Sequence, residues 1–557
     1  MSPELKNINP DNLGSLEESR QAIKVLIASI EEIYSELGKL KEENRLLREE
    51  NNRLKGGSAR PRFGKRSSGF RDISSGGQEH GVTKCSTDDA LRKEFVLDAD
   101  EQVTIQVDKS LLPPGSVFKG YATYEQQDIE IKRRNKLFRF EVWYCPASGT
   151  TFQAPWPQGH AEGHYGPGIR SLLNVLRHMS DVTEPLLHKL MQSLGVKISA
   201  GTISNLLKEE SNWVLQERDD ILRAALACRG PKQMDATANK QQGKSRMTHI
   251  VTAPNFTVFY TTEHKNRLNC LSVLQGNPDE GIKLLWYEGI DERLRAAKVG
   301  AQHPGKLREL MQNNPCLTLP AFEALMKAKA PKMASTRFVM NVIREEMALA
   351  YYRNQTDYPP VESLLTDYAH EYEKIAVRQG LCWVHDARRY NLLSPTMYWF
   401  AQKLEQFKTR YWEYYWKLLD YRNQVPEVQK KRKPQLLQEF DDLFSISTDY
   451  PDLDKTIAIS KANKERLLVV LDIPSMPLHN NAAELAARRV VRKRDISLHA
   501  WSDWGAKLRD AFLSVIQTAI KLDISPYQFI CDRVSRNCNM PSLARIITER
   551  NVATMTF

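Results

Sequence analysis

The sequence predicts a multidomain α+β protein, and three observations point to this fold class. The chain has 557 residues, enough for about three or four domains of ordinary size. Its apolar fraction of 41% and charged fraction of 26% are those of a globular protein with a sizeable core. Stretches with helical periodicity and stretches with the alternation of strands occupy separate blocks of the chain, as in α+β proteins.

The charge balance favours a polyanionic partner. Lysine and arginine number 79 against 68 aspartates and glutamates, which gives a formal charge of +11. Such a surplus is typical of nucleic-acid-binding proteins, although solubility alone would also explain it. No apolar run reaches the ~18 residues that a membrane span needs, and the N-terminus lacks the layout of a signal peptide. The eight cysteines show no paired framework, so we expect a cytoplasmic protein with free thiols and no membrane partner.

A heptad repeat predicts that residues 1–56 form a dimeric coiled coil. Glutamates at g positions face lysines or arginines at e positions of a parallel partner, and asparagine at a selects two strands in register. The alternative is a single amphipathic helix that packs on its own protein. The predicted dimer contacts are Leu26, Ile33, Leu40, Asn44, Leu47, Asn51 and Leu54.

Two segments of different character follow the repeat. Residues 57–82 are rich in Gly, Ser and basic residues and predict a flexible linker, which either contacts DNA phosphates or is simply solvated. Residues 83–157 look β-rich, with strands expected in EQVTIQV (101–107) and KLFRFEVWYC (136–145). Cys85 and Cys145 lack CxxC partners, so we expect no structural zinc there.

Residues 158–228 predict a helical domain with a helix-turn-helix motif. A first helix over 184–194 ends at Gly195, and a second helix runs through Thr202 to Leu207. In this motif the early residues of the second helix face base edges, so Thr202, Ser204 and Asn205 are the candidate DNA contacts. An ordinary helical hairpin would give the same pattern.

Residues 229–557 predict a larger mixed domain. SRMTHIVTA (245–253) and FTVFYTT (256–262) read as a hairpin around Pro254-Asn255. Helical blocks are expected near 278–345 and 395–465, and the segment 481–557 is mostly helical.

Three carboxylates in this domain could serve phosphoryl-transfer chemistry. Asp235 precedes the hairpin, Asp367 precedes a helix-like EYEKIAV stretch, and Glu484 lies in a predicted helix. In-line displacement at a phosphodiester needs charge stabilisation of both the attacking and the leaving oxygen, which two Mg²⁺ ions can provide. Hard cations take oxygen ligands, so a few convergent carboxylates suffice.

Structural interpretations of the same acids remain open. Most acidic residues are solvated, and Asn481 has capping-box spacing to Glu484. Glu484 also has the spacing for a helical ion pair with Arg488. Asp357 repeats the Thr-Asp-Tyr context of Asp367, but it precedes two prolines and is expected in a loop.

A CxxH string and a basic run accompany the acids. Cys382, Trp383 and His385 predict a buried Trp-Cys pair beside a hydrogen-bonded histidine, since further metal ligands are not evident. The basic residues are either a solvated helix face or a phosphate clamp beside a metal site. They and the histidine form the candidate DNA-binding and site-supporting set His385, Arg388, Arg389, Arg488, Arg489, Arg492 and Lys493.

The sequence resembles transposases of the bacterial insertion-sequence-sixty-six family. The family's Ala-Asp-Glu-Thr, Leu-Gln-Thr-Asp-Gly-Tyr and Asp-Asn-Asn-Ala-Ala-Glu-Arg strings are matched at 234–237, 364–368 and 479–485. Its Cys-Trp-Ala-His-Ala-Arg-Arg string is matched at 382–389 with one inserted residue. Its C-terminal end resembles Ser502-Asp503-Trp504-Gly505 and the helix that follows.

The resemblance implies a DDE transposase with an RNase H-like catalytic core at 229–557. Asp235, Asp367 and Glu484 would be the catalytic and metal-binding residues, holding two Mg²⁺, or Mn²⁺ in their place. The partners would be double-stranded DNA, as transposon ends and target, a second copy of the chain, and element-encoded helper proteins. The setting would be the bacterial cytoplasm and its nucleoid.

The chain departs from the family pattern at several points. Most zinc-finger cysteines are missing, so 83–157 reads as a degenerate zinc-finger-like segment. The first two acids are further apart than usual, which fits the inserted helical block, and the second motif lacks its glycine. Two other functions stay open: a catalytically inactive DNA-binding regulator or domesticated remnant, and a nuclease that cuts without joining.

Overall fold

The computed structural model describes residues 131–553, with the exception of 158–159, 161–162, 277–280, 498–499 and 501. It also describes most of 101–130 and scattered positions between 15 and 43. These residues divide into two compact units. One contains 155–188 and 199 to the end of the described chain, and the other contains 189–198 with the described part of 69–154. The protein is a mixed α+β structure, as predicted.

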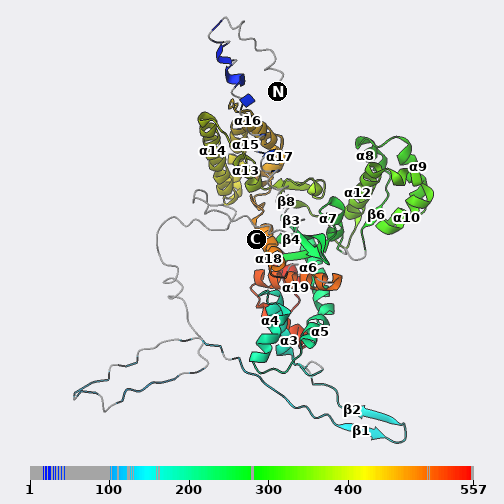
Figure 1. Cartoon of the computed structure of the whole chain (residues 1–557), viewed down its shortest axis with the longest axis vertical. Helices are drawn as coiled ribbons and strands as arrows, with labels where there is room; N and C mark the ends of the chain where they lie inside the picture. The colour runs from blue at the N-terminus through cyan, green and yellow to red at the C-terminus, as the bar shows by residue number, and fades with distance from the viewer. Residues whose placement is uncertain are drawn as a thin grey trace. The chain divides into compact units, whose positions relative to one another are not determined.

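A five-stranded mixed sheet forms the centre of the first unit, in the order β5-β4-β3-β8-β9 (Figure 1). Strands β3 (Lys232–Gln241), β4 (Lys244–Ala253) and β5 (Phe256–Thr262) form an antiparallel meander. The β4–β5 hairpin pairs Ala253 with Phe256 and confirms the predicted turn at Pro254-Asn255. Strands β8 (Ser363–Thr366) and β9 (Arg378–Leu381) continue the sheet parallel to β3.

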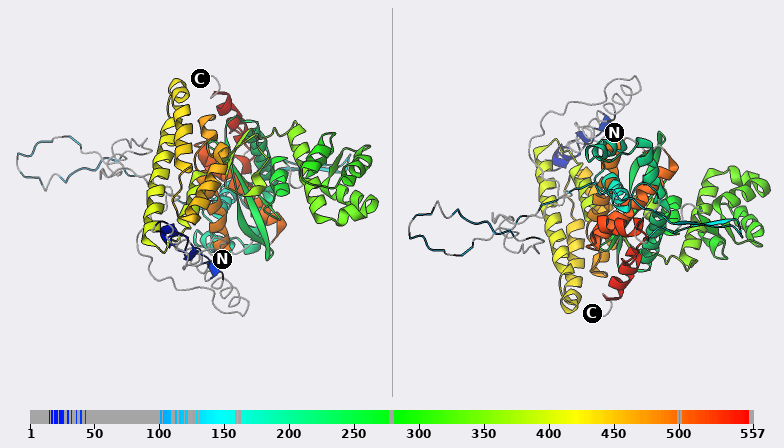
Figure 2. Two further views of the ribbon diagram at one scale, coloured as in Figure 1. Left: turned by 90° about the horizontal axis from the view of Figure 1, so that it is seen from above. Right: turned by 90° about the horizontal axis from the view of Figure 1, so that it is seen from below.

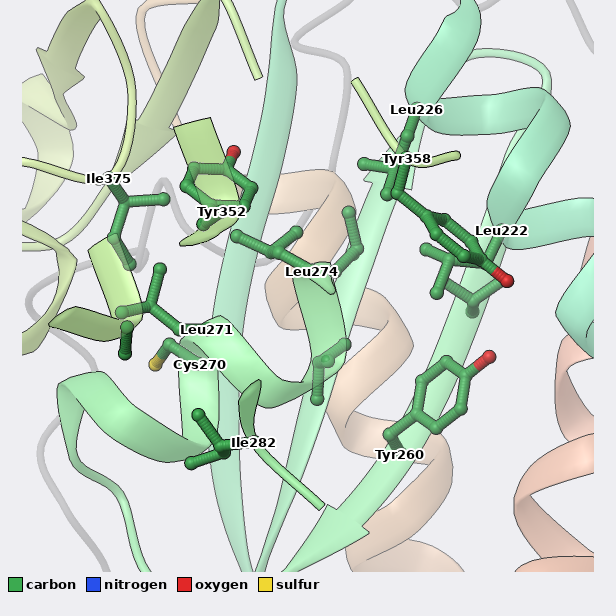
Figure 3. Close-up of a cluster of buried hydrophobic side chains, with 14 of the residues drawn as sticks. Leu222, Leu226, Tyr260, Cys270, Leu271, Leu274, Ile282, Tyr352, Tyr358 and Ile375 are labelled. Carbon is green, nitrogen blue, oxygen red and sulfur yellow. The ribbon is translucent and has the colours of Figure 1, made fainter. Parts of the chain in front are cut away.

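Helices cover both faces of this sheet. On one face, α6 (Ser211–Ala227), α7 (Arg267–Leu274) and α12 (Arg337–Asn354) contribute to the main hydrophobic core. Figure 3 shows part of it, where Leu222, Leu271, Leu274 and Tyr352 surround the strands. On the other face, α18 (Asn481–Ser497) packs on Ile250 and Phe259 through Ala486, Ala487 and Val490.

Two helical blocks interrupt the sheet domain where the sequence predicts them, and they lie on opposite sides of it (Figure 2). The first contains α8 (Ile290–Ala296), α9 (Gln302–Met311), α10 (Leu319–Lys329) and α11 (Pro331–Ser335). It also holds an unpredicted antiparallel pair, β6 (Lys283–Leu285) with β7 (Cys316–Thr318). The second contains α14 (Tyr398–Arg422), α15 (Pro426–Phe444), α16 (Pro451–Ala462) and α17 (Lys464–Leu467).

The second block has a hydrophobic core of its own, which joins it to α13 (Trp383–Asn391). Trp383 is fully buried among Tyr411, Tyr414 and Phe440, and its indole N–H donates to Leu467 O at 2.9 Å. The predicted buried Trp-Cys pair is confirmed, since Cys382 is fully buried as well. The aromatic core thus fixes the start of α13 against the inserted helices.

The remaining helices come before β3 and after α18 in the sequence. The segment after α18 is helical as predicted, with α19 (Asp503–Lys521), α20 (Pro526–Val534) and α21 (Leu543–Ala553). Before the sheet come α3 (Pro167–His178), α4 (Glu184–Ser193) and α5 (Ala200–Glu209). Helices α4 and α5 match the two predicted helices, and Ser199 Oγ caps α5 by accepting from Thr202 N at 3.1 Å. Asn205 is exposed, whereas Thr202 and Ser204 are half-buried. A helix-turn-helix remains a prediction.

The described part of the predicted β-rich segment 83–157 contains fewer strand residues than expected. It contains one hairpin, β1 (Val142–Cys145) with β2 (Thr150–Gln153), and the described residues of 101–107 form no strand. The apolar side chains of Val103 and Ile105 are 74% and 87% exposed, so no second layer buries them. Alternation produces a stable strand only where one face is covered.

The N-terminal repeat is described in part. The described positions between 17 and 43 are helical, and the a and d side chains of Ile23, Leu26, Ile30 and Leu40 are 40–55% exposed. Ile33, Asn44, Leu47, Asn51 and Leu54 lie outside the described residues, as do the linker 57–82 and Cys85. The dimeric coiled coil stays a prediction.

The described cysteines are free thiols, as predicted. Among the described residues, no helix is both long and apolar enough to cross a membrane.

Candidate functional site

Asp235 lies on the sheet face that α18 covers. It belongs to β3, where its Cα partner on β4 is Ile250, and opposite residues of an antiparallel pair point to the same face. Ile250 packs on α18, whereas the neighbouring Met234 points into the core on the other face. The half-buried Asp235 carboxylate therefore faces the helix that carries Glu484.

Asp367 follows directly after β8, the strand next to β3. The parallel register pairs Gln233 with Leu365, so Asp235 and Asp367 come at the same level of neighbouring strands. Asp367 Oδ1 accepts a hydrogen bond from Ala369 N at 3.0 Å. The helix predicted for EYEKIAV is reduced to the short 3₁₀ helix η4 (His370–Tyr372), because Tyr372 and Ile375 pack into the core. The rival acid Asp357 is exposed in a loop, as expected.

Glu484 lies in the first turn of α18, which is tied to the sheet by the preceding Asn480. The Asn480 side chain is fully buried, and its Nδ2 donates to Met234 O at 3.1 Å, next to Asp235. Its backbone N–H donates to Cys382 Sγ at 3.2 Å. Asn481 is the first helical residue, and the Glu484 side chain turns to α13 instead of closing a capping box.

Asp235 is influenced electrostatically by the other two carboxylates. Burial, as the largest cause, together with the negative charges of Asp367 and Glu484 raises the pKa of Asp235 from 3.8 to about 6. The hydrogen bond from Ala236 N and the charge of Lys265 act in the opposite direction. Like charges raise a carboxyl pKa from nearby, so Asp367 and Glu484 lie near enough to Asp235 to affect its pKa.

Two cations of the protein neutralise part of this charge. Lys265, from the segment between β5 and α7, has its Nζ 3.5 Å from Asp367 Oδ2. Arg388 of α13 has its Nη2 3.1 Å from Glu484 Oε2, and its Nη1 is 2.9 Å from His385 Nε2. Burial and the charge of Arg388 lower the pKa of His385, so the imidazole is neutral near pH 7.

Helix α13 is held beside the site by a buried acid. Asp386 is fully buried and accepts hydrogen bonds from Tyr368, Tyr411 and Ser460, at 2.6, 3.1 and 2.8 Å. Tyr368 follows Asp367 directly, and the guanidinium of Arg389 lies 3.9 Å from the centre of its ring. The network connects the loop after β8 to α13 and so fixes His385 and Arg388 relative to Asp367.

The chemistry of the three carboxylates, though not their arrangement in this structure, fits a hard divalent cation. Three carboxylates of this kind are the oxygen ligands that Mg²⁺ and Mn²⁺ prefer, and few are needed because Mg²⁺ retains waters. The pKa of Asp235 is raised first by burial and then by the charges of Asp367 and Glu484, and a cation beside the carboxylate would oppose both effects. In the part of the chain that the structure describes, no group of three or more His, Cys, Asp or Glu is arranged to hold a metal ion. Asp367 and Glu484 face Lys265 and Arg388 instead.

The basic residues of α18 differ in accessibility. Arg488 and Arg492 are exposed and Arg489 is half-buried, so all three stay candidates for DNA contact. Lys493 is no longer a candidate for DNA contact, because its side chain is buried on the inner face of the helix. Its Nζ donates to Arg177 O at 2.9 Å and lies 3.6 Å from Asp181 Oδ1.

Sequence reasoning missed two charged residues at this site, Lys265 and Glu371. The Nζ of Lys265 lies 3.3 Å from Glu371 Oε1. Neither residue stands in a recognisable motif, and only the folding of the β5–α7 segment against η4 brings them together. A signal was present for Asn480, which lies in the Asn-Asn-Ala-Ala-Glu string.

Comparisons with known proteins agree with the resemblance. Residues 327–508 match the family model described as transposase IS66 family, which confirms the predicted resemblance over this part of the chain. This range contains Asp367, His385 and Glu484 but not Asp235. The uncharacterized protein y4jO of Sinorhizobium fredii is 28% identical over 325 residues, which are 56% of this chain and 94% of that protein. No solved structure matches the chain.

Proposed function

We propose that this protein is a DNA transposase of the DDE type, which cleaves DNA at transposon ends and joins the freed 3′-OH to target DNA. The observation that carries the proposal is that Asp235 on β3 and Asp367 after β8 come at the same level of neighbouring strands, on a sheet whose face is covered by the helix of Glu484. The match of 327–508 to the transposase IS66 family supports it independently, because it rests on sequence. The strand order, with Asp235 on β3 and Asp367 after its parallel neighbour β8, supports an RNase H-like core.

In this proposal Asp235, Asp367 and Glu484 hold two Mg²⁺ ions, or Mn²⁺. When bound, such a pair stabilises charge on the attacking and leaving oxygens of an in-line phosphoryl transfer, which serves both cleavage and joining. The chain's own residues orient the acids. Asn480 positions the start of α18, and Arg388 of α13 pairs with the Glu484 carboxylate.

DNA binding in the proposal uses the basic surplus of the chain and two surfaces. The exposed arginines of α18 would contact backbone phosphates near the acids, since Arg488 and Arg492 lie one to two turns beyond Glu484. The polar early residues of α5 would read end sequences. The N-terminal repeat would pair two copies, so that two transposon ends are processed together; helper proteins of the element would be further partners.

Cleavage of a labelled element end tests the proposal. Purified protein is incubated with the end and its own flanking DNA in Mg²⁺, beside the Glu484→Gln variant. We expect the wild type to nick at the end and the variant to bind the DNA without nicking it. Binding without cleavage by both proteins, in Mg²⁺ and in Mn²⁺, with helper proteins supplied, would contradict the enzyme and favour a catalytically inactive DNA-binding protein.

A further inference from the structure

Lys265 occupies a position that the three proposed catalytic acids do not explain. It lies between β5 and α7, and its side chain is 26% exposed. Its Nζ is 3.5 Å from Asp367 Oδ2 and 3.3 Å from Glu371 Oε1. The ammonium is therefore shared between an acid of the site and an acid outside it.

Glu371 holds Lys265 in place. Its side chain is only 6% exposed, and its ion-pair partners are Lys265 and His370, whose Nδ1 is 3.6 Å away. The His370 side chain is 88% exposed, so Lys265 is the better-shielded of the two partners of Glu371. The ring of Tyr372 lies beside the ammonium, with its centroid 5.5 Å from Nζ. A buried carboxylate needs a cationic partner, so Lys265 is expected to stay in this position even when Asp367 turns away.

Arg388, the other cation of the site, is held differently. It pairs with Glu484, but its side chain is 42% exposed, and among the described residues it forms no ion pair with a second acid. Lys265 is less exposed and is bridged between two carboxylates. A positive charge fixed in this way beside Asp367 is preorganised, which is the property that electrostatic stabilisation of a reacting phosphate requires.

We propose that Lys265 is a phosphate-binding residue of the site, anchored by Glu371. In the DNA-free protein it neutralises Asp367. With Asp367 engaged as a metal ligand, as in the function proposed above, the ammonium would remain on Glu371 and would donate a hydrogen bond to a non-bridging oxygen of the scissile phosphodiester. This inference rests on the function proposed above and adds to it a specific contact with the substrate.

Two measurements on Lys265→Met test the contact. Single-turnover cleavage of a bound element end is expected to be about 100-fold slower than in the wild type, with the affinity for the end changed less than about threefold. Mn²⁺ binding to the DNA-free protein, followed by the electron paramagnetic resonance of free Mn²⁺, is expected to be about tenfold tighter, because a competing cation is gone. Lys265→Arg, which keeps the charge, is expected to recover part of the cleavage rate.

The double variant Lys265→Met/Glu371→Gln separates phosphate binding from a merely structural role. Lys265→Met alone leaves a buried charge on Glu371, which could disturb the fold. The double variant removes that charge and should melt like the wild type. We expect it to stay about 100-fold impaired in cleavage. Cleavage at the wild-type rate by the double variant would overturn the inference, since it would show that Lys265 only neutralises Glu371.

The outcomes also distinguish this inference from the proposed function. A wild type that cleaves, with Lys265→Met cleaving equally fast, would refute the role of Lys265 and leave the transposase intact. A wild type that cuts no end, and whose Mn²⁺ binding is unaffected by Asp235→Asn, would refute the proposed function and the inference with it.

Discussion

Replacing Asp235 by asparagine is expected to stabilise the metal-free protein at neutral pH while abolishing cleavage. Burial and two neighbouring acids raise the pKa of Asp235 from 3.8 to about 6. Each pKa unit corresponds to about 1.4 kcal/mol, so keeping this carboxylate ionised costs the folded state about 3 kcal/mol. Asparagine has the same shape and no charge, so the variant avoids this cost.

The sign of the effect sets its pH dependence. The folded protein holds the Asp235 proton more tightly than the unfolded chain, because the folded pKa is the higher one. Below about pH 4 both states are protonated and the acid carries no cost. Between about pH 4 and pH 6 the wild type progressively loses about 3 kcal/mol relative to the variant, and above pH 6 the difference is constant.

Thermal unfolding in the presence of EDTA measures this difference. At pH 7.5 the unfolding temperature of Asp235→Asn is expected to exceed that of the wild type by about 5 °C, and at pH 4 the two should agree. Mg²⁺ should narrow the gap, because a bound cation offsets the charge in the wild type. Asp357→Asn, in an exposed loop, is the matched control and should change nothing. An equal or lower unfolding temperature for Asp235→Asn at pH 7.5 would refute the argument that burial and the neighbouring acids raise the pKa of Asp235.

Three further predictions concern the support of the site and its DNA contacts. Asn480→Ala removes the hydrogen bond to Met234 O, and we expect it to lower the free energy of unfolding in urea by about 1–3 kcal/mol. It should also slow cleavage more than it weakens end binding. An unchanged cleavage rate would contradict the role of Asn480 in positioning α18. Trp383→Ala empties a fully buried site and should cost about 3–5 kcal/mol, with a smaller loss for Trp383→Phe; a loss under about 1 kcal/mol would contradict the packing. Arg492→Ala should weaken end binding and lower by about one the slope of log affinity against log salt concentration. Lys493→Ala should lower the unfolding temperature and leave that slope unchanged. The reverse pattern would show that Lys493 contacts DNA.

Local sequence signals predicted a large part of the fold. The β4–β5 hairpin, the helical blocks near 278–345 and 395–465, and the helix of Glu484 all have periodicity and boundary residues that act within a few turns. The strand that carries Asp235 has no such signal, because KQMDATANKQ is largely polar. It is a strand because β4 pairs with it on one side and β8 on the other, which is a property of the folded sheet.

The candidate site shows the same division. Asp367, His385 and Glu484 stand in strings that the sequence alone singles out, whereas the pairing of Lys265 with Glu371 depends on how a loop and a 3₁₀ helix pack. Lys493 is among the predicted DNA contacts although it is not exposed. In the sequence, every residue of the basic run looks solvated, but the helix directs the Lys493 side chain inward to Asp181.

Joining of a precut transposon end to a target plasmid tests the central claim most directly, because it separates a transposase from a nuclease. The substrate is an end with a free 3′-OH, supplied with Mg²⁺ and supercoiled target DNA. We predict that the wild type joins the end and that Asp235→Asn, Asp367→Asn and Glu484→Gln bind it without joining. A wild type that nicks ends but never joins them, or a carboxylate variant that joins at the wild-type rate, would contradict the account.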